Sequence, residues 1–249
     1  MTTRLNTITS GIQIGGITYD LIVEETIFQN KVYSCYLQES EEPEDRERKT
    51  IEIGSFDNDQ YDCDCAEFYA GGGKFTDTAP VDRAGEDAPI MSAESFANTQ
   101  TENDAENIVD NWDFPPEVPA EAITEIKERL ADELFEVGFS RVENYAETKI
   151  EEERQAAEKQ IEENKESCGE KWDVSVDYEY NDGLFWQNGG HELWEKFADR
   201  HLERITMSAE KGAKFIREAA KIPAYFHNKE LSDCPFIFNP ADEEEGGAE

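Results

Sequence analysis

Residues 120–164 read AEAITEIKERLADELFEVGFSRVENYAETKIEEERQAAEKQIEEN, and this stretch decides most of the fold. Apolar residues recur in it every three or four positions, which is the spacing of one face of an α-helix. Pro115, Pro116 and Pro119 come just before it, and proline suits the first turn of a helix. The stretch therefore predicts one long helix, in which Gly138 would introduce a kink or a break.

The apolar stripe of this helix thins after Tyr145, and a nearly all-polar run begins at Glu151. A helical segment without an apolar face has little to pack against its own chain. We therefore expect the second part of the helix to project into solvent or to pair with something outside this chain.

The start of the chain predicts antiparallel β-structure. Strand-forming residues, many of them alternating with polar or small ones, occupy residues 12–23, 32–37 and 50–53. Gly15-Gly16 supplies a turn, and the highly charged residues 39–48 supply a hairpin loop. We predict a β-rich domain over residues 1–75.

Residues 76–118 differ from both of these regions. Thr, Asp, Ala, Pro and Asn dominate the segment, and we find no apolar periodicity in it. Long segments of this kind inside a protein are usually functional or unstructured. We predict an acidic linker or an extended arm.

Residues 119–240 predict a helical domain that carries a small β-hairpin near 172–186. Alternating apolar residues form the first arm of the hairpin, and a second helix is expected from about 191 to 221, where Pro223 ends it. Residues 241–249 predict a disordered acidic tail. The fold class that follows is α+β.

The chain has a large negative charge. Its 249 residues contain 59 Asp and Glu against 23 Lys and Arg, a formal net charge of −36. The charge is spread evenly, at −9, −10, −9 and −8 over residues 1–75, 76–120, 121–170 and 171–249. Self-repulsion of this size opposes folding, so a cationic partner or a demanding solvent should compensate for it. A salt-loving host is one alternative, although the 13 Lys outnumber the 10 Arg.

Composition also excludes several classes of function. No stretch approaches 18 consecutive apolar residues, and the first 16 residues lack the apolar core of a signal peptide. The charge repels anionic lipids and nucleic acid backbones, so we expect no membrane and no direct nucleic acid partner. The five cysteines are irregularly spaced and are expected to be free thiols in a reducing cytoplasm.

Cys63-Asp64-Cys65, followed by Phe68 and three glycines, resembles the opening of a SWIM-type zinc finger. The family completes its tetrahedral site with a second Cys-x-His pair. Lys74, Phe75 and Thr76 stand where that pair would be, and none of them can ligate zinc. We therefore expect no metal here.

Enzyme motifs are incomplete as well. His191-Glu192 begins like the helix motif of zinc peptidases, but Glu195 stands where the second histidine must be. His201 lies ten residues on, at the wrong angle to form the pair. We find no Gly-x-Ser-x-Gly, no phosphate-binding loop and no Cys near an activating His. We expect no enzymatic activity and no cofactor.

What remains is the acidic surface. Acidic residues at helical spacing follow the polar flank of the long helix: Glu125, Glu128, Asp132, Glu136, Glu143 and Glu147. In composition the chain resembles the acidic nucleic-acid-mimicking inhibitors that phages and mobile elements make against restriction enzymes and CRISPR complexes. That resemblance implies stoichiometric binding to a basic nucleic-acid-binding protein or ribonucleoprotein, through these carboxylates. The alternative is a structural or assembly protein that oligomerises through its long helix, with the charge serving solubility.

Overall fold

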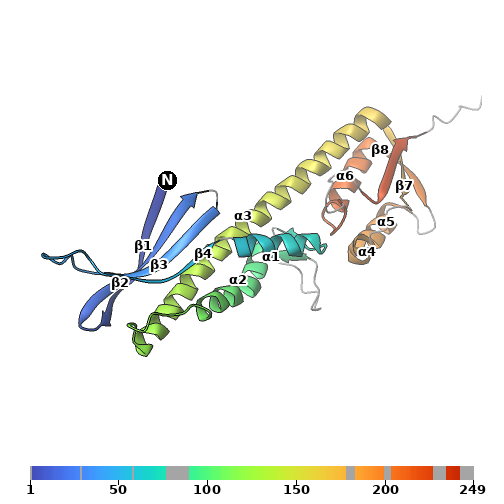
Figure 1. The fold of residues 1–249 in the computed structure, drawn as a ribbon. Coiled ribbons are helices and arrows are strands. Elements are labelled where there is room, and N and C mark those ends of the chain that lie inside the picture. Colours follow the sequence, from blue (N-terminus) through green and yellow to red (C-terminus); the bar gives the residue numbers. More distant parts are fainter. Residues whose placement is uncertain are drawn as a thin grey trace, which may run out of the picture. The chain divides into compact units, whose positions relative to one another are not determined.

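The structure is a computed structural model that describes residues 2–28, 30–57, 59–76, 90–177, 183–198, 203–226 and 234–241. It is α+β, as predicted, with a four-stranded antiparallel sheet, a long helix and a small C-terminal antiparallel sheet (Figure 1). The chain divides into two compact units, each built from two separate segments. Unit 1 comprises residues 1–66 and 93–145, and unit 2 comprises residues 67–92 and 146–249.

Unit 1 contains a β-meander in which each strand pairs with the next. Its strands are β1 (Thr2–Ile14), β2 (Ile17–Phe28), β3 (Asn30–Glu39) and β4 (Thr50–Asp57). Gly15 and Gly16, both with positive φ, form the two-residue turn between β1 and β2 that the sequence predicts. The charged loop between β3 and β4 is also where it was expected.

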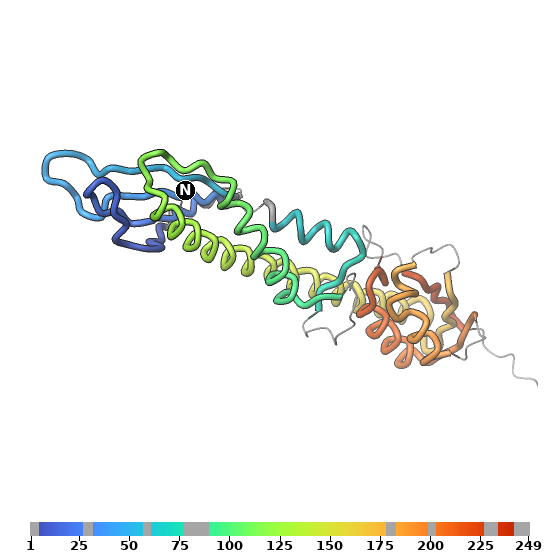
Figure 2. Tube along the Cα trace, turned by 90° about the horizontal axis from the view of Figure 1, so that it is seen from below, coloured from blue at the N-terminus to red at the C-terminus, as the bar shows by residue number. Residues whose placement is uncertain are grey.

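Three helices belong wholly or partly to unit 1: α1 (Asp59–Ala70), α2 (Ala93–Asp110) and α3 (Ala120–Cys168). The trace in Figure 2 shows α2 running beside the first part of α3. Leu21 and Leu37 of the sheet share one apolar core with Ile126, Leu130 and Leu134 of α3, and each is at most 1% exposed. The apolar residues that alternate along the strands and those of the α3 stripe therefore pack into a single core.

The prediction of an unstructured segment over 76–118 is wrong for the residues that the structure describes. Residues 93–110 form α2, and residues 77–89 lie outside the described part of the chain. Ala97, Thr101 and Ala105 lie four residues apart on the buried face of α2. The Thr101 hydroxyl donates to the Ala97 carbonyl (2.6 Å), which makes its burial possible. Because the side chains at these positions are small, the sequence shows almost no helical pattern of large apolar residues here.

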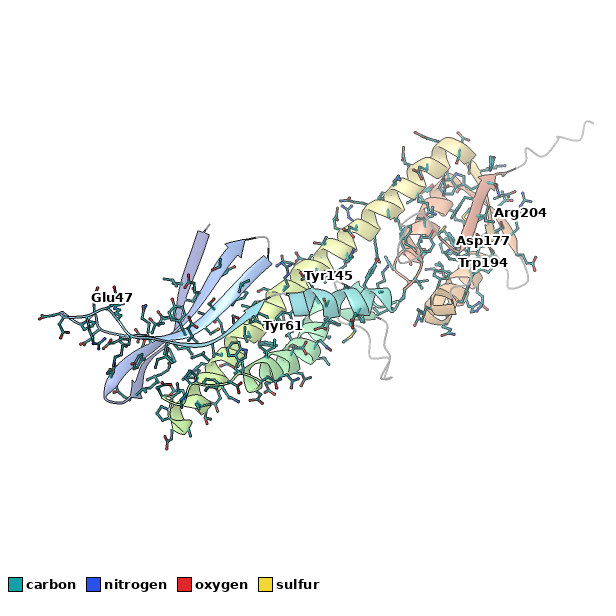
Figure 3. All side chains as sticks on the ribbon, viewed as in Figure 1. Glu47, Tyr61, Tyr145, Asp177, Trp194 and Arg204 are labelled. Atoms are coloured by element: carbon teal, nitrogen blue, oxygen red, sulfur yellow. The ribbon has the colours of Figure 1, made fainter. Side chains whose placement is uncertain are left out.

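Gly138 does not break α3, which runs continuously from Ala120 to Cys168. A Cβ at Gly138 would lie 2.6 Å from the ring of Tyr61, so glycine is needed because this ring lies against the helix backbone (Figure 3). Tyr61 is fully buried, and its hydroxyl donates to the Leu134 carbonyl (3.2 Å). Gly138 therefore allows close packing of Tyr61 against α3 and does not bend the helix.

The second part of α3 packs within its own chain, contrary to the expectation. Ala157, Ile161 and Cys168 are buried in the core of unit 2. They lie four and seven residues apart, on one face, between charged residues. Because alanine and cysteine bury little area, a short apolar face was read as a polar run.

Unit 2 contains the C-terminal sheet. Its central strand β7 (Lys171–Val176) pairs antiparallel with β8 (Arg204–Ser208) and β9 (Phe236–Pro240), and β5 (Lys74–Thr76) pairs in parallel with β6 (Ile90–Ser92). The helices are α4 (Gly183–Phe185), the π-helix η1 (Trp186–Gly190), α5 (His191–Phe197) and α6 (Ala209–Ala219). Its core is aromatic, with Trp172, Phe185, Phe215, Tyr225 and Phe236 all at most 4% exposed.

Two predictions in this region are corrected. The hairpin near 172–186 has its first arm as β7, but residues 183–190 are helical, and β7 pairs with distant strands instead. The helix expected over 191–221 is interrupted by β8, where Ile205 and Met207 are buried and their neighbours are exposed. Ile205 and Met207 have the two-residue spacing of a strand, but so short a run did not stand out from the helical pattern expected around it. Of the predicted tail, residues 241–249, the first is described and its N–H donates to the Lys171 carbonyl (3.1 Å), while residues 242–249 lie outside the described residues.

Candidate functional site

The six predicted carboxylates all lie on α3 and all are exposed. At 100° per residue, they fall within about a third of the helix circumference. Five of them belong to unit 1, and Glu147 belongs to unit 2. Among the described residues, no lysine or arginine forms an ion pair with any of the six.

Their exposure follows from the packing of α3. Ile126, Leu130 and Leu134 turn one face of the helix into the core, so residues on the opposite face must point outward. This part of α3 has three cations, and two of them are used elsewhere in unit 1, whereas Arg129 is exposed on the side of the carboxylates and is ion-paired with none of them. Lys127 Nζ lies 2.8 Å from Asp110 of α2, and Arg141 Nε donates to Asp62 of α1 (2.6 Å).

Helix α2 adds acidic residues that the sequence analysis did not single out. Glu102, Glu106 and Asp110 are exposed and lie four residues apart, so they share one flank of the helix. They were missed because the segment was predicted to be a linker. The four-residue spacing of the acids was the signal that could have revealed them.

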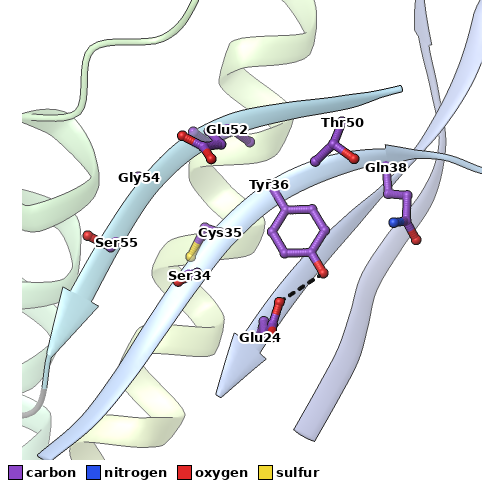
Figure 4. A pocket seen from close by; sticks show the side chains of 10 residues that line it. Glu24, Ser34, Cys35, Tyr36, Gln38, Thr50, Glu52, Gly54 and Ser55 are labelled. Carbon is purple, nitrogen blue, oxygen red and sulfur yellow. Dashed lines mark hydrogen bonds between the residues drawn. The ribbon is translucent and has the colours of Figure 1, made fainter. Parts of the chain in front are cut away.

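The outer face of the sheet is hollowed. Because Tyr33, Cys35 and Leu37 enter the core, the alternate residues of β3 point to the other face, where a cavity of about 720 Å³ lies (Figure 4). Its polar lining includes Glu24, Ser34, Tyr36, Gln38, Thr50 and Glu52. The Tyr36 hydroxyl donates to Glu24 (3.2 Å), and burial followed by the Glu24 charge raises the pKa of this tyrosine. This face presents carboxylates and neutral hydrogen-bonding groups, and no lysine or arginine lines the cavity.

The loop between β3 and β4 is held at its base by one arginine. Arg46 donates to both carboxylate oxygens of Glu39 (2.6 and 2.7 Å), and the Lys49 N–H donates to the same group (3.1 Å). These hydrogen bonds lower the pKa of Glu39 to about 2. The loop beyond this clamp is exposed and carries further acids, among them Glu47 (Figure 3).

Two carboxyl groups meet between α1 and α2. Burial, and then the hydrogen bond and charge of Asp64, raise the pKa of Asp104 to about 6. One oxygen of each carboxyl group is buried. The nearby carboxyl group of Asp64 therefore disfavours the ionised form of Asp104 inside unit 1.

The cysteine pair has no zinc-finger geometry. Cys63 and Cys65 lie on α1, where residues two apart point about 200° away from each other, and only Cys65 is buried. Burial raises the pKa of the Cys65 thiol to about 12. The two sulfurs cannot both ligate one ion. Within the described ranges, no group of three or more His, Cys, Asp or Glu residues could hold a metal ion.

His191 begins α5 as an exposed residue, and its ring lies against Trp186, with centroids 5.1 Å apart. His201 lies outside the described residues, so its place relative to His191 is not described. In the part of the chain that the structure covers, no helix is long and apolar enough to cross a membrane.

Comparison with family models, with curated proteins and with solved structures found no match. Function is therefore inferred from the residues of this chain alone.

Proposed function

We propose that the protein is an acidic inhibitor or regulator that binds a basic nucleic-acid-binding protein complex, such as a CRISPR or restriction effector. Its carboxylates would occupy lysine and arginine sites that otherwise hold phosphates. Opposite charge would also steer the encounter, which raises association rates most at low ionic strength. The proposal requires no catalysis, no cofactor and no direct contact with nucleic acid.

The observation that carries the proposal is the exposed stripe of carboxylates on α3 that no described cation neutralises. Four of them, from Glu125 to Glu136, span 11 residues, or about 16 Å of helix axis. One strand of B-DNA presents a phosphate about every 3.4 Å, so this stripe alone is sparser than a nucleic acid strand. The acids of α2 and of the β3–β4 loop belong to the same unit and supply further negative charge.

Unit 1 is the more acidic of the two units. It contains 28 acidic and 8 basic residues, a formal charge of −20, whereas unit 2 has 31 and 15, a charge of −16. Three of its eight bases, Arg46, Lys127 and Arg141, are ion-paired at positions away from the α3 stripe. This distribution supports unit 1 as the part that contacts the partner.

The rival hypothesis, assembly through α3, would need an apolar stripe that is free to meet a second copy. The most apolar positions of α3 are instead buried: Ile126, Leu130 and Leu134 in unit 1, and Ala157 and Ile161 in unit 2. This burial favours the inhibitor over the assembly protein.

The test begins with capture from a bacterial lysate at low salt, followed by a competition assay. Each captured protein is purified, and its binding to a fluorescent duplex or guide RNA is measured with increasing amounts of this protein. We expect displacement at stoichiometric concentrations, and an affinity that falls at least about tenfold between 50 and 200 mM salt. If the captured proteins keep their nucleic acid at saturation, or if affinity does not change with salt, the proposal is wrong.

A further inference from the structure

A second cavity, in unit 2, has a lining whose charge is opposite to that of the chain. It has a volume of about 570 Å³ and lies among β5, the start of β6, α3 and the end of α6. Four of its twelve lining residues are basic and two are acidic, whereas acids outnumber bases by 59 to 23 in the whole chain. The four cations are Lys74, Arg154, Arg217 and Lys221.

The wall of this cavity also has an apolar part. Phe75, Ile90, Ile150 and Ala157 line it, from three different elements. Cavities that bind small molecules usually combine an apolar wall with a few convergent polar groups. The apolar residues provide an area on which a hydrocarbon or aromatic body could lie.

Lys74 is the buried charge of the cavity. The residue is 8% exposed, its ammonium group is ion-paired with Glu153, and it donates to the Ala220 carbonyl (2.5 Å). Glu153 is itself fixed by the Tyr69 hydroxyl, which donates to Oε1 (2.9 Å). An ammonium group has three donors, and these are its two acceptors among the described residues. One donor therefore remains for a ligand.

The outer cations are held loosely. Arg217 donates to both oxygens of Glu158 (2.7 and 2.9 Å), and Arg154 to both oxygens of Glu151 (2.8 and 2.7 Å). The side chains of both arginines are more than half exposed, and such pairs contribute little to stability. A guanidinium has five N–H donors, so each arginine can accept a second anion without losing its glutamate.

We propose that this cavity binds a small organic anion whose apolar body lies on Phe75, Ile90 and Ile150. Its carboxylate or phosphate head group is held by Arg154, Arg217 and Lys221, with the free donor of Lys74 at the inner end. This binding site is independent of the acidic surface of unit 1, so either proposal can fail while the other stands.

Titration calorimetry with three probes of similar apolar body tests this inference: decanoate, decyl phosphate and the uncharged octyl glucoside. We expect at least one anion to bind stoichiometrically and at least tenfold more tightly than octyl glucoside. Binding of both anions would show that the cavity accepts either head group. Binding of only one would identify the head group as carboxylate or phosphate.

Variants then locate the site. Arg154→Gln combined with Arg217→Gln should weaken anion binding at least tenfold, and Lys221→Gln alone should weaken it by a smaller factor. Lys159→Gln, which removes an exposed ion-paired cation of α3 outside this cavity, is the matched control and should bind like wild type. Absence of anion binding, equal binding of octyl glucoside, or unchanged binding in Lys221→Gln and the folded double variant would each overturn the proposal.

Discussion

The two halves of α3 have similar compositions and use their charges differently. Residues 120–145 carry seven acidic residues, and residues 146–168 carry eight. Six of the eight form ion pairs with cations of unit 2: Glu151, Glu152, Glu153, Glu158, Glu162 and Glu163. None of the seven is ion-paired with a described residue.

The difference comes from where the nearby cations point. In the second half, lysines and arginines lie three or four residues from a glutamate, or reach it from α6 and β5. In the first half, Lys127 and Arg141 reach α2 and α1 instead, and the exposed Arg129 forms no ion pair with a described residue. The number of acidic residues alone therefore does not identify a surface that can bind a cationic partner. The ion pairs that each acidic residue forms within the chain do identify it.

The largest expected effect is on partner binding, and it distinguishes the first half of α3 from the second. A variant with Glu125, Glu128, Asp132 and Glu136 changed to Lys should bind the proposed partner at least about 100-fold more weakly, because each lost contact is replaced by repulsion. It should melt within about 2 °C of wild type, since exposed single charges contribute little to stability. Binding is measured by calorimetry at two salt concentrations, and the loss should shrink at the higher one.

The control for this variant lies in the other half of α3. Changing Glu151, Glu152, Glu162 and Glu163 to Lys gives this control the same net charge as the first variant. Each reversal adds two positive charges, so four of them change the net charge from −36 to −28. This control breaks ion pairs, so it should melt lower than wild type and still bind the partner. Equal loss of binding in both variants would show that net charge, not the first-half stripe, is recognised.

A smaller effect is expected from Gly138→Ala. The new Cβ would lie 2.6 Å from the Tyr61 ring, and displacing a packed ring costs more than the roughly 1 kcal/mol that alanine gains in helix propensity. We expect the free energy of unfolding in urea to fall by about 1–2 kcal/mol. In a Tyr61→Leu background the same change should be neutral or stabilising. A gain in the wild-type background would mean that the ring moves freely.

Asp104 should make unit 1 less stable as the pH rises through 6. Its folded-state pKa of about 6 lies above the ordinary 3.8, so the stabilisation is complete below about pH 4 and is lost above pH 6. Wild type should lose about 1 kcal/mol of unfolding free energy between pH 5 and 7, allowing for solvent screening. Asp104→Asn should not show this loss.

The pH window separates this effect from the other carboxylates. Ordinary Asp and Glu are already ionised at pH 5. Glu39, with its pKa lowered to about 2, contributes stability that is lost only as the pH falls below about 4.5. A parallel loss in Asp104→Asn between pH 5 and 7 would assign the effect to another group.

The smallest effect is expected from Lys127→Gln. Its ion pair with Asp110 joins α3 to α2, but the Asp110 side chain is 71% exposed. Removal should change the unfolding free energy by less than about 0.5 kcal/mol. Partner binding should be unchanged or slightly tighter, because the variant loses a positive charge in unit 1. Clearly weaker binding would place Lys127 itself in the interface.

The sequence predicted the elements whose apolar residues are large and regular. The meander and α3 were found because Leu21, Leu37 and Ile126 repeat with clear periods of two or of three to four. Helix α2 was missed because its buried stripe is Ala97, Thr101 and Ala105. The strand β8 was missed because only two apolar residues, Ile205 and Met207, mark its period of two.

The candidate site was predictable in part. The exposure of the six carboxylates followed from the apolar stripe opposite them, and all six are exposed in the structure. Their role in binding a partner stays a prediction. Four ion pairs of the second half join residues three or four apart and follow from the spacing. The pairs to Lys74 and Arg217 were not predictable, because these two cations are far from α3 in sequence. The unit-2 cavity was missed for the same reason, since its cations come from separate segments.

The two units interleave along the chain, which has a consequence during synthesis. The sheet of unit 1 is complete at residue 57, but the large apolar residues of α3 that share its core begin at residue 126. At 5–20 residues per second, a ribosome needs roughly 3–14 s to deliver them. During this interval the nascent chain exposes Leu21 and Leu37, and such intermediates are prone to aggregate. Repulsion between neighbouring acidic nascent chains would delay their association until the covering helix emerges.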